Sequence, residues 1–262
     1  MADSHPQSAD EFKVKDVLGN GQQSAFASYR KIYYGEASVA RVLASELIIT
    51  LFSWIPGALG LVLRKVFYPF LFGQVGSKVV FGRNLTIRHP HKIRLGDRVI
   101  LDDGCVIDAK GDTNRGIVIG NDTYVGRNTI IYCKNGDIDI QPAVNISSNC
   151  QIFSSNSLTI GKGTIIGAFS YLLSGGEYDY TDQSTPFAEQ TGTNSKGPLI
   201  VGENCWLAAR VTVLDGTGIG DHCVLGAGAV VTNPIPAGTV AVGIPARVAK
   251  TITSPDEKGN AP

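Results

Sequence analysis

The sequence predicts an all-β solenoid that carries an N-terminal helical and apolar extension. Two observations within residues 76–233 support this prediction. Aliphatic residues recur at steps of six in six triplets along the chain: Leu95-Leu101-Ile107, Ile119-Val125-Ile131, Ile140-Ile146-Ile152, Ile160-Ile166-Leu172, Val201-Leu207-Val213 and Ile219-Leu225-Val231. The position two residues before an aliphatic one is small or β-branched in nearly every case: Val99, Cys105, Thr123, Thr129, Val144, Cys150, Thr164, Ser170, Cys205, Val211, Thr217, Cys223 and Ala229.

The step of six excludes ordinary helices and flat strands. A strand repeats every two residues and a helix every 3.6. A short strand followed by a tight turn fits six residues, and three such units make one coil. Both marked positions then point inward, so four of the five cysteines become reduced core residues: Cys105, Cys150, Cys205 and Cys223. Cys133 lies beside an insertion, where the register does not place it.

Composition narrows the function. The 262 residues hold 23 basic and 23 acidic side chains, so no global field favours nucleic acid as a partner. The N-terminus has no basic segment followed by an apolar run, which argues against a secretory signal and for the cytoplasm. The five cysteines form no C-x-x-C pair, which argues against a zinc or redox site, and no metal is expected.

Four segments divide the chain. Residues 1–44 are a partly helical extension, with a helix expected at about 25–43, and residues 45–75 are apolar. The repeat array occupies 76–233, and residues 234–262 begin with turn signals and end in a polar tail. The stretch 47–63 has no charge, is broken by Pro56-Gly57, and is followed by Arg64 and Lys65. Segment 45–73 is therefore either an anchor at the membrane surface, a cap on the solenoid or a subunit contact. Membrane contact would place the protein at the inner face, near a lipid-linked or exported glycan.

The interruptions of the six-residue period fall at the same position of the coil each time. Insertions follow Ile107, Ile131, Ile152 and Leu172, each in the third hexad of its coil, so all four leave from one corner. Insertions on one side of a solenoid often form a binding face, and loop 174–198 is long enough to be functional. The insertions supply the candidate substrate-binding residues, which are Asn135, Asn156, Gly175 and Gly176.

Three features together resemble the hexapeptide-repeat acyltransferases over roughly Val79 to Lys250, most closely the sugar O-acetyltransferase branch. They are the hexads, the stretch Val-Gly-Glu-Asn-Cys-Trp-Leu at 201–207, and the ending Val-Gly-Ile-Pro-Ala-Arg-Val at 242–248. The resemblance implies a left-handed parallel β-helix and a homotrimer with active sites between subunits. It also implies acetyl-CoA or another acyl-CoA as co-substrate, lying in a groove between two solenoids, and a sugar or glycan hydroxyl as acceptor.

The resemblance also implies roles for individual residues. Trp206 would lie beside the acyl and pantetheine arm, and Ala209 and Ala227 would offer backbone contacts without bulk. At the nucleotide end the implied contacts come from Thr232, Arg247 and Lys250. A guanidinium and an ammonium suit phosphate groups, although both can equally be ordinary surface charges.

The family's catalytic histidine normally follows the two glycines of the long loop, where this chain has Glu177. Histidine suits proton removal near neutral pH. We expect burial or a nearby acid, such as Asp179, to make Glu177 a competent base. The alternative is a scaffold or binding module that has lost catalysis.

Other histidines are poor substitutes for this base. His89 and His91 precede the first triplet and lie more than about 15 Å from the loop along the axis, and His222 falls at another corner. The four histidines do not supply the zinc ligands of a solenoid carbonic anhydrase, and no segment is free for the nucleotide-binding domain of a sugar nucleotidyltransferase.

Overall fold

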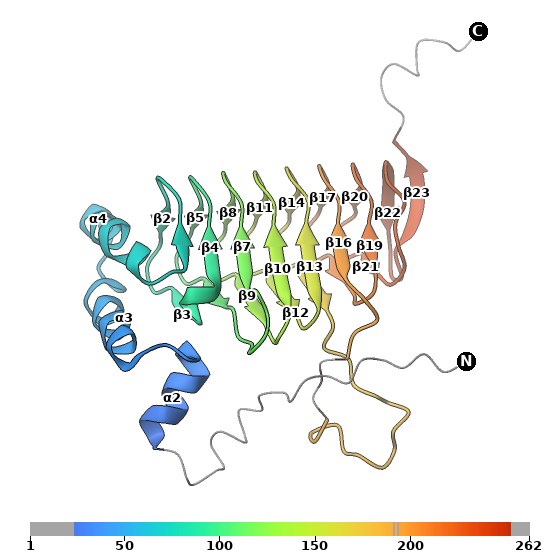
Figure 1. Cartoon of the computed structure of the whole chain (residues 1–262). Coiled ribbons are helices and arrows are strands. Elements are labelled where there is room, and N and C mark those ends of the chain that lie inside the picture. The colour runs from blue at the N-terminus through green and yellow to red at the C-terminus, as the bar shows by residue number, and fades with distance from the viewer. Residues whose placement is uncertain (1–23, 191, 193, 253–262) are drawn as a thin grey trace.

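The computed structural model describes residues 24–190, 192 and 194–252, and its body is a three-sided prism of short strands (Figure 1). Sheet A contains β1 (Gln74–Val75), β4 (Ile93–Leu95), β7 (Ile117–Ile119), β10 (Asp137–Ile140), β13 (Ser157–Ile160), β16 (Leu199–Val201) and β19 (Gly218–Ile219). Sheet B contains β2 (Val80–Phe81), β5 (Ile100–Leu101), β8 (Tyr124–Val125), β11 (Asn145–Ile146), β14 (Ile165–Ile166), β17 (Trp206–Leu207), β20 (Val224–Leu225), β22 (Thr239–Val242) and β23 (Arg247–Thr251). Sheet C contains β3 (Thr86–Arg88), β6 (Val106–Asp108), β9 (Ile130–Cys133), β12 (Gln151–Ser154), β15 (Tyr171–Ser174), β18 (Thr212–Val213) and β21 (Val230–Val231).

The chain visits sheets A, B and C in turn, and from β1 to β18 each strand pairs in parallel with the strand three places later. The predicted left-handed parallel β-helix with an N-terminal helical extension is confirmed. The described residues form seven complete turns, whereas the triplets indicated six. The additional turn is β1–β3, whose residues Val75, Phe81 and Ile87 repeat the step of six. The signal for this turn was therefore present in the sequence.

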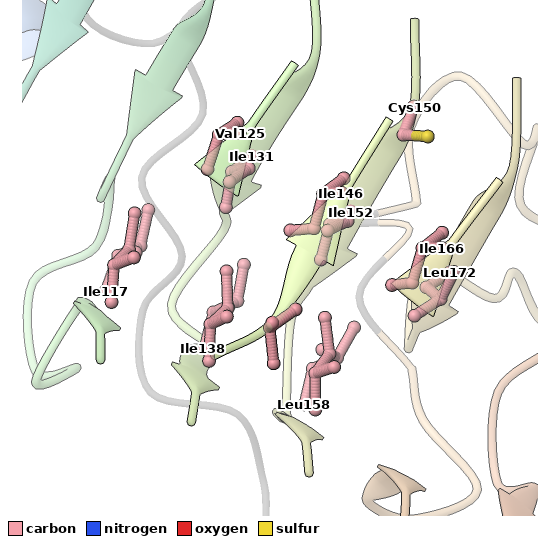
Figure 2. Close-up of a cluster of buried hydrophobic side chains, with 14 of the residues drawn as sticks. Ile117, Val125, Ile131, Ile138, Ile146, Cys150, Ile152, Leu158, Ile166 and Leu172 are labelled. Atoms are coloured by element: carbon pink, nitrogen blue, oxygen red, sulfur yellow. The ribbon is translucent and has the colours of Figure 1, made fainter. Parts of the chain in front are cut away.

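The predicted register is the one that packs the core. Aliphatic residues of successive turns stack in columns, such as Ile117 on Ile138 on Leu158 (Figure 2). All thirteen small or β-branched positions are buried as predicted, and all five cysteines are free and buried, Cys133 among them. Fully burying one aliphatic side chain contributes about 1.5–3 kcal/mol, so the repeated columns are the main source of stability.

In the part of the chain that the structure describes, three α-helices precede the solenoid and lie at one end of it: α2 (Ala25–Tyr34), α3 (Val39–Phe52) and α4 (Gly57–Phe67) (Figure 1). A single helix over 25–43 was expected, but Gly35 adopts φ +60° and separates two helices there. Ser24 and Ser38 cap α2 and α3 by accepting hydrogen bonds from backbone N–H groups. The predicted break at Pro56-Gly57 is confirmed between α3 and α4.

The apolar segment covers the open end of the prism. The described residues include two short 3₁₀ helices, η1 (Tyr68–Phe70) after α4 and η2 (Pro90–Lys92) after β3. Tyr68 and Phe72 pack on Phe81 of the first turn, with ring centroids 5.5 Å apart in both pairs. Arg64 is 1% exposed and donates hydrogen bonds to the carbonyl oxygens of Phe81, Phe52 and Ile55, at 2.9, 3.1 and 2.8 Å. This guanidinium fastens both helices to the solenoid.

The C-terminal segment closes the opposite end. Residues 234–262 were expected to continue as turns and a tail, but β22 extends sheet B in parallel and β23 returns antiparallel to it. The predicted polar tail lies outside the described residues from 253 onward, as does His5 at the N-terminus.

Candidate active site

The insertions gather at one edge of the prism, as predicted. The segments that follow sheet C strands all leave from the edge between sheets C and A, which we call the insertion corner: 109–116, 134–136, 155–156 and 175–198. The turn 89–92 after β3 also belongs to this corner. It escaped sequence analysis because the first turn had not been recognised. The longest insertion projects from the prism as the large loop in Figure 1.

Asp215 holds the base of the long loop. This residue follows β18 at the same corner, one turn beyond β15, and is 4% exposed. Its carboxylate accepts hydrogen bonds from the Gly175 N–H at 2.5 Å, the Ser195 hydroxyl at 2.9 Å and the Lys196 N–H at 2.5 Å. Both arms of the loop are therefore fixed to one buried charge. Sequence analysis missed Asp215, although the stacking of corner turns could have indicated it.

Glu177 lies next to these three hydrogen bonds of Asp215, which we call the clamp. Its N–H donates to the Asn194 carbonyl oxygen at 3.0 Å, which bridges the two arms of the loop. Its Oε1 accepts a hydrogen bond from Lys196 Nζ at 2.6 Å, and its side chain is 33% exposed. This hydrogen bond raises the pKa of the Lys196 ammonium. The partner of Glu177 in the structure is therefore a cation from the returning arm.

Asp179 organises the next turn of the loop. Its Oδ1 accepts hydrogen bonds from the Thr181 N–H at 2.9 Å and the Thr181 hydroxyl at 2.6 Å. These bonds hold the pKa of Asp179 below its usual range. Gln190 binds the backbone of Asp179 from across the loop, at 2.8 and 3.0 Å. The acid that was expected to influence Glu177 is thus engaged with Thr181.

The candidate substrate-binding residues lie in successive turns of the insertion corner. Asn135 Oδ1 accepts from the Asp112 N–H at 2.7 Å, and Asn156 Nδ2 donates to the Ser195 hydroxyl at 3.0 Å. Gly175 and Gly176 have φ +87° and +84°, which favours glycine. A Cβ on Gly175 would collide with a side-chain oxygen of the neighbouring turn, and one on Gly176 would meet the Phe153 ring at 3.0 Å. The asparagines and glycines therefore also shape the corner.

The residues assigned to acyl-CoA lie mainly on sheet B. Trp206 is 55% exposed, and the strand register carries its row through Val224 and Val240 to Lys250 at the edge. Arg247 lies on β23 as well. Ala209 and Ala227 occupy exposed turns after β17 and β20, and Thr232 is exposed after β21.

Within a single chain, the residues of the long loop and the residues assigned to acyl-CoA lie on different sides of the prism. The loop residues leave from the corner of sheets C and A, while Trp206 lies on the outer face of sheet B. His222 is an exposed turn residue between sheets A and B, as predicted. In the described part of the chain, no three His, Cys, Asp or Glu side chains are placed to hold a metal ion.

Comparisons with known proteins agree on one family. A model of the bacterial transferase hexapeptide family (six repeats) matches residues 198–233. The putative lipopolysaccharide biosynthesis O-acetyl transferase WbbJ of Escherichia coli is 32% identical over 176 residues, which cover 65% of this chain and 81% of that protein. The putative colanic acid biosynthesis acetyltransferase WcaF of Escherichia coli is 28% identical over 200 residues, covering 76% and 80% of the two chains.

A solved structure shares the fold. The N-acyltransferase AntD of Bacillus cereus, crystallised with dTDP and 3-hydroxybutyryl-CoA, aligns with a TM-score of 0.51 and 19% identity, over 73% of this chain and 89% of AntD. At this identity the likeness describes the fold alone.

Proposed function

We propose that this chain, which belongs to the hexapeptide-repeat acyltransferase family and is an acyltransferase, transfers an acetyl group from acetyl-CoA to a hydroxyl of a sugar or glycan. The acceptor class is supported by relatives named for lipopolysaccharide and colanic acid biosynthesis. The observation that carries the proposal is the clamped base of the long loop, which holds Glu177 at the insertion corner. Because the donor is acetyl-CoA, the proposed compartment is the cytoplasm.

In the proposed reaction Glu177 is the base. As its carboxylate takes the hydroxyl proton, the acceptor oxygen attacks the carbonyl carbon of the thioester. The new C–O bond forms, the C–S bond breaks, and the proton passes from Glu177 to the departing CoA sulfur. Lys196 positions the carboxylate through the ion pair, and Asp179 shapes the turn that follows. Asn135, Asn156, Gly175 and Gly176 line the path of the acceptor.

The donor would lie against sheet B. Trp206 presents an exposed aromatic surface for the pantetheine arm, and Ala209 and Ala227 leave the neighbouring turns open. Thr232, Arg247 and Lys250 would receive the nucleotide end, where Arg247 and Lys250 are exposed cations suited to phosphate.

A homotrimer would complete the site. Because the loop residues and the donor residues lie on different sides of one prism, the proposed site pairs the loop of one subunit with sheet B of its neighbour. The acyl-CoA would then lie in the groove between two solenoids.

We also propose that α3 and α4 touch the inner face of the membrane. Their exposed large apolar residues are Val39, Leu43, Leu47, Leu51, Leu59, Leu61, Val62 and Val66, with Trp54 between the helices. Among the described residues, no helix has the length and apolarity needed to span a bilayer. An amphipathic surface of this kind suits binding in the interface.

Point substitutions test membrane contact better than deletion of residues 45–73. Tyr68, Leu71 and Phe72 belong to the core, so deletion would also uncover the solenoid. We expect the triple variant Leu47→Ser, Leu51→Ser, Trp54→Ser to lose cosedimentation with anionic vesicles while the thermal transition is retained. Equal cosedimentation by the wild-type and triple-variant proteins would contradict the membrane proposal.

A non-catalytic scaffold or binding module is the second candidate function. It is favoured by one observation, the engagement of Glu177 by Lys196. Release of free thiol from acetyl-CoA in the presence of candidate glycans, together with calorimetry of CoA binding, separates the two functions. Glycan-dependent thiol release supports the transferase. Glycan binding without CoA binding or thiol release supports the module.

A further inference from the structure

A pocket of about 210 Å³ lies at the first turns of the insertion corner, apart from the proposed transfer site. Its walls come from α2, from the turn 89–92 and from the loop after β6. The inner part is lined by Lys31, His89, His91, Lys92 and Lys110, which are buried or half-buried. The pocket thus collects three ammonium groups and two imidazoles.

Two of these residues are held rigidly. Lys92 Nζ donates hydrogen bonds to the Gly111 carbonyl oxygen at 2.5 Å and to Asn114 Oδ1 at 2.9 Å. His89 is 3% exposed and its Nδ1 contacts Asp108 Oδ1 at 3.2 Å. These contacts fix the positions of Lys92 and His89 in the pocket wall.

The charges that line the pocket favour an anionic ligand. The two carboxylates of the pocket lining, Glu36 and Asp112, belong to exposed residues, whereas the three lysines are half-buried. Asp108 contacts His89, and its charge is also paired with Arg88 at 3.7 Å. Water screens exposed charges more than buried ones, so the interior is effectively positive. Ammonium groups around a small pocket suit the oxygens of a phosphate group.

A polar row connects this pocket to the long loop. The Asn135 N–H donates to the Lys110 carbonyl oxygen at 3.1 Å, and the Asp137 N–H donates to the Asn156 carbonyl oxygen at 2.9 Å. Asn156 in turn contacts Ser195 of the loop. From β3 to β15 the corner rises by four turns, or about 19 Å at the usual strand spacing of about 4.8 Å. A short oligosaccharide can span that length.

The opposite side of the pocket adjoins the apolar helices. Helix α2 forms one wall, and α3 follows it after four residues. The order along the molecule is therefore an apolar face, a cationic pocket, a polar corner and the transfer loop. The same order of chemistry occurs in a saccharide joined through phosphate to an apolar carrier.

We propose that this pocket binds the phosphate that joins the saccharide acceptor to its carrier. The assignment of that phosphate to the acceptor rests on the proposed function, whereas the existence of an anion site does not. The hydroxyl to be acetylated would then lie about four turns away, beside Glu177.

The anion site is tested by titrating the full-length protein with sodium pyrophosphate in a calorimeter. We expect millimolar or tighter binding that weakens at least tenfold in Lys110→Gln and in His91→Gln. Lys162→Gln, which changes a lysine in a turn outside the corner, should bind as the wild type does. No detectable binding, or equal binding by all four proteins, would overturn the proposal.

Competition and transfer kinetics test the source of the phosphate. CoA should not displace pyrophosphate, and displacement from this pocket would assign it to the donor and overturn the acceptor proposal. The kcat/KM for a diphosphate-linked saccharide should exceed that for the free saccharide. Lys110→Gln should lower the ratio of these two values at least tenfold. Equal kcat/KM values for the two acceptors would contradict the acceptor proposal. If the protein transfers no acetyl group at all, the proposed function fails while the pyrophosphate titration still decides the anion site.

Discussion

Replacing Asp215 by asparagine should release the long loop without disturbing the solenoid. Asp215 Oδ1 accepts hydrogen bonds from the Gly175 N–H and the Ser195 hydroxyl, and Oδ2 accepts from the Lys196 N–H. An asparagine keeps the shape but removes the charge. Its amide nitrogen then replaces one oxygen and faces a donor, so at least one buried N–H loses its acceptor.

The magnitude follows from these three contacts. Hydrogen bonds to charged groups contribute about 1.5–3 kcal/mol each, and a buried donor without a partner costs about 1–3 kcal/mol. One donor loses its acceptor and the bonds that remain are weakened by the loss of charge, so we expect a loss of about 3 kcal/mol in the local opening free energy. At about 1.4 kcal/mol per tenfold, opening becomes roughly a hundred times more frequent.

Hydrogen exchange read by mass spectrometry measures this opening directly. The reporters are the amides of Gly175, Glu177 and Lys196, which are hydrogen-bonded at the loop base. Asp221→Asn is the matched control, because Asp221 accepts a backbone N–H at 2.8 Å in a turn at another corner. Unchanged exchange at the three reporters in Asp215→Asn would refute the clamp.

Three further outcomes are expected. Trp206→Ala should weaken acetyl-CoA binding about tenfold in calorimetry because large aromatic contacts often dominate binding, while Ile165→Ala on the same sheet face should have little effect. Arg64→Met leaves three carbonyl oxygens without their donor, so the thermal transition should fall by about 5–10 °C, with Lys65→Met as the exposed control. Burial raises the pKa of the Cys105 thiol to about 12, so at pH 8 this thiol should resist iodoacetamide in the folded protein and react after unfolding in guanidinium. Rapid labelling of the native protein would contradict that burial.

Periodicity predicted the parts of the molecule that repeat. A residue such as Cys150 has its place fixed by the step of six, because every turn must fill the same narrow interior. The insertion corner was predicted for the same reason, since its position depends only on which hexad is interrupted. Even Val75, Phe81 and Ile87 follow the rule, although Leu85 stands two residues before Ile87, where a small or β-branched residue is usual.

The contacts within the insertions could not be predicted in this way. Lys196 reaches Glu177 only because the loop returns to its own base, and Asp215 meets Gly175 across forty residues of sequence. Neither contact leaves a periodic signal. The helix break at Gly35 was missed because neighbouring residues have helical character, and only the local φ of +60° separates α2 from α3.

The central claim is that Glu177 removes the proton of the acceptor, and single-turnover acetyl transfer by Glu177→Gln tests it most directly. The substitution keeps the hydrogen-bonding shape but not the basicity, so the transfer rate should fall about 10²–10⁴-fold while the affinity for acetyl-CoA is retained. Lys196→Met serves as the comparison, because it removes the ion pair but leaves the carboxylate and should reduce the rate much less. A Glu177→Gln rate equal to that of the wild-type protein would contradict the assignment.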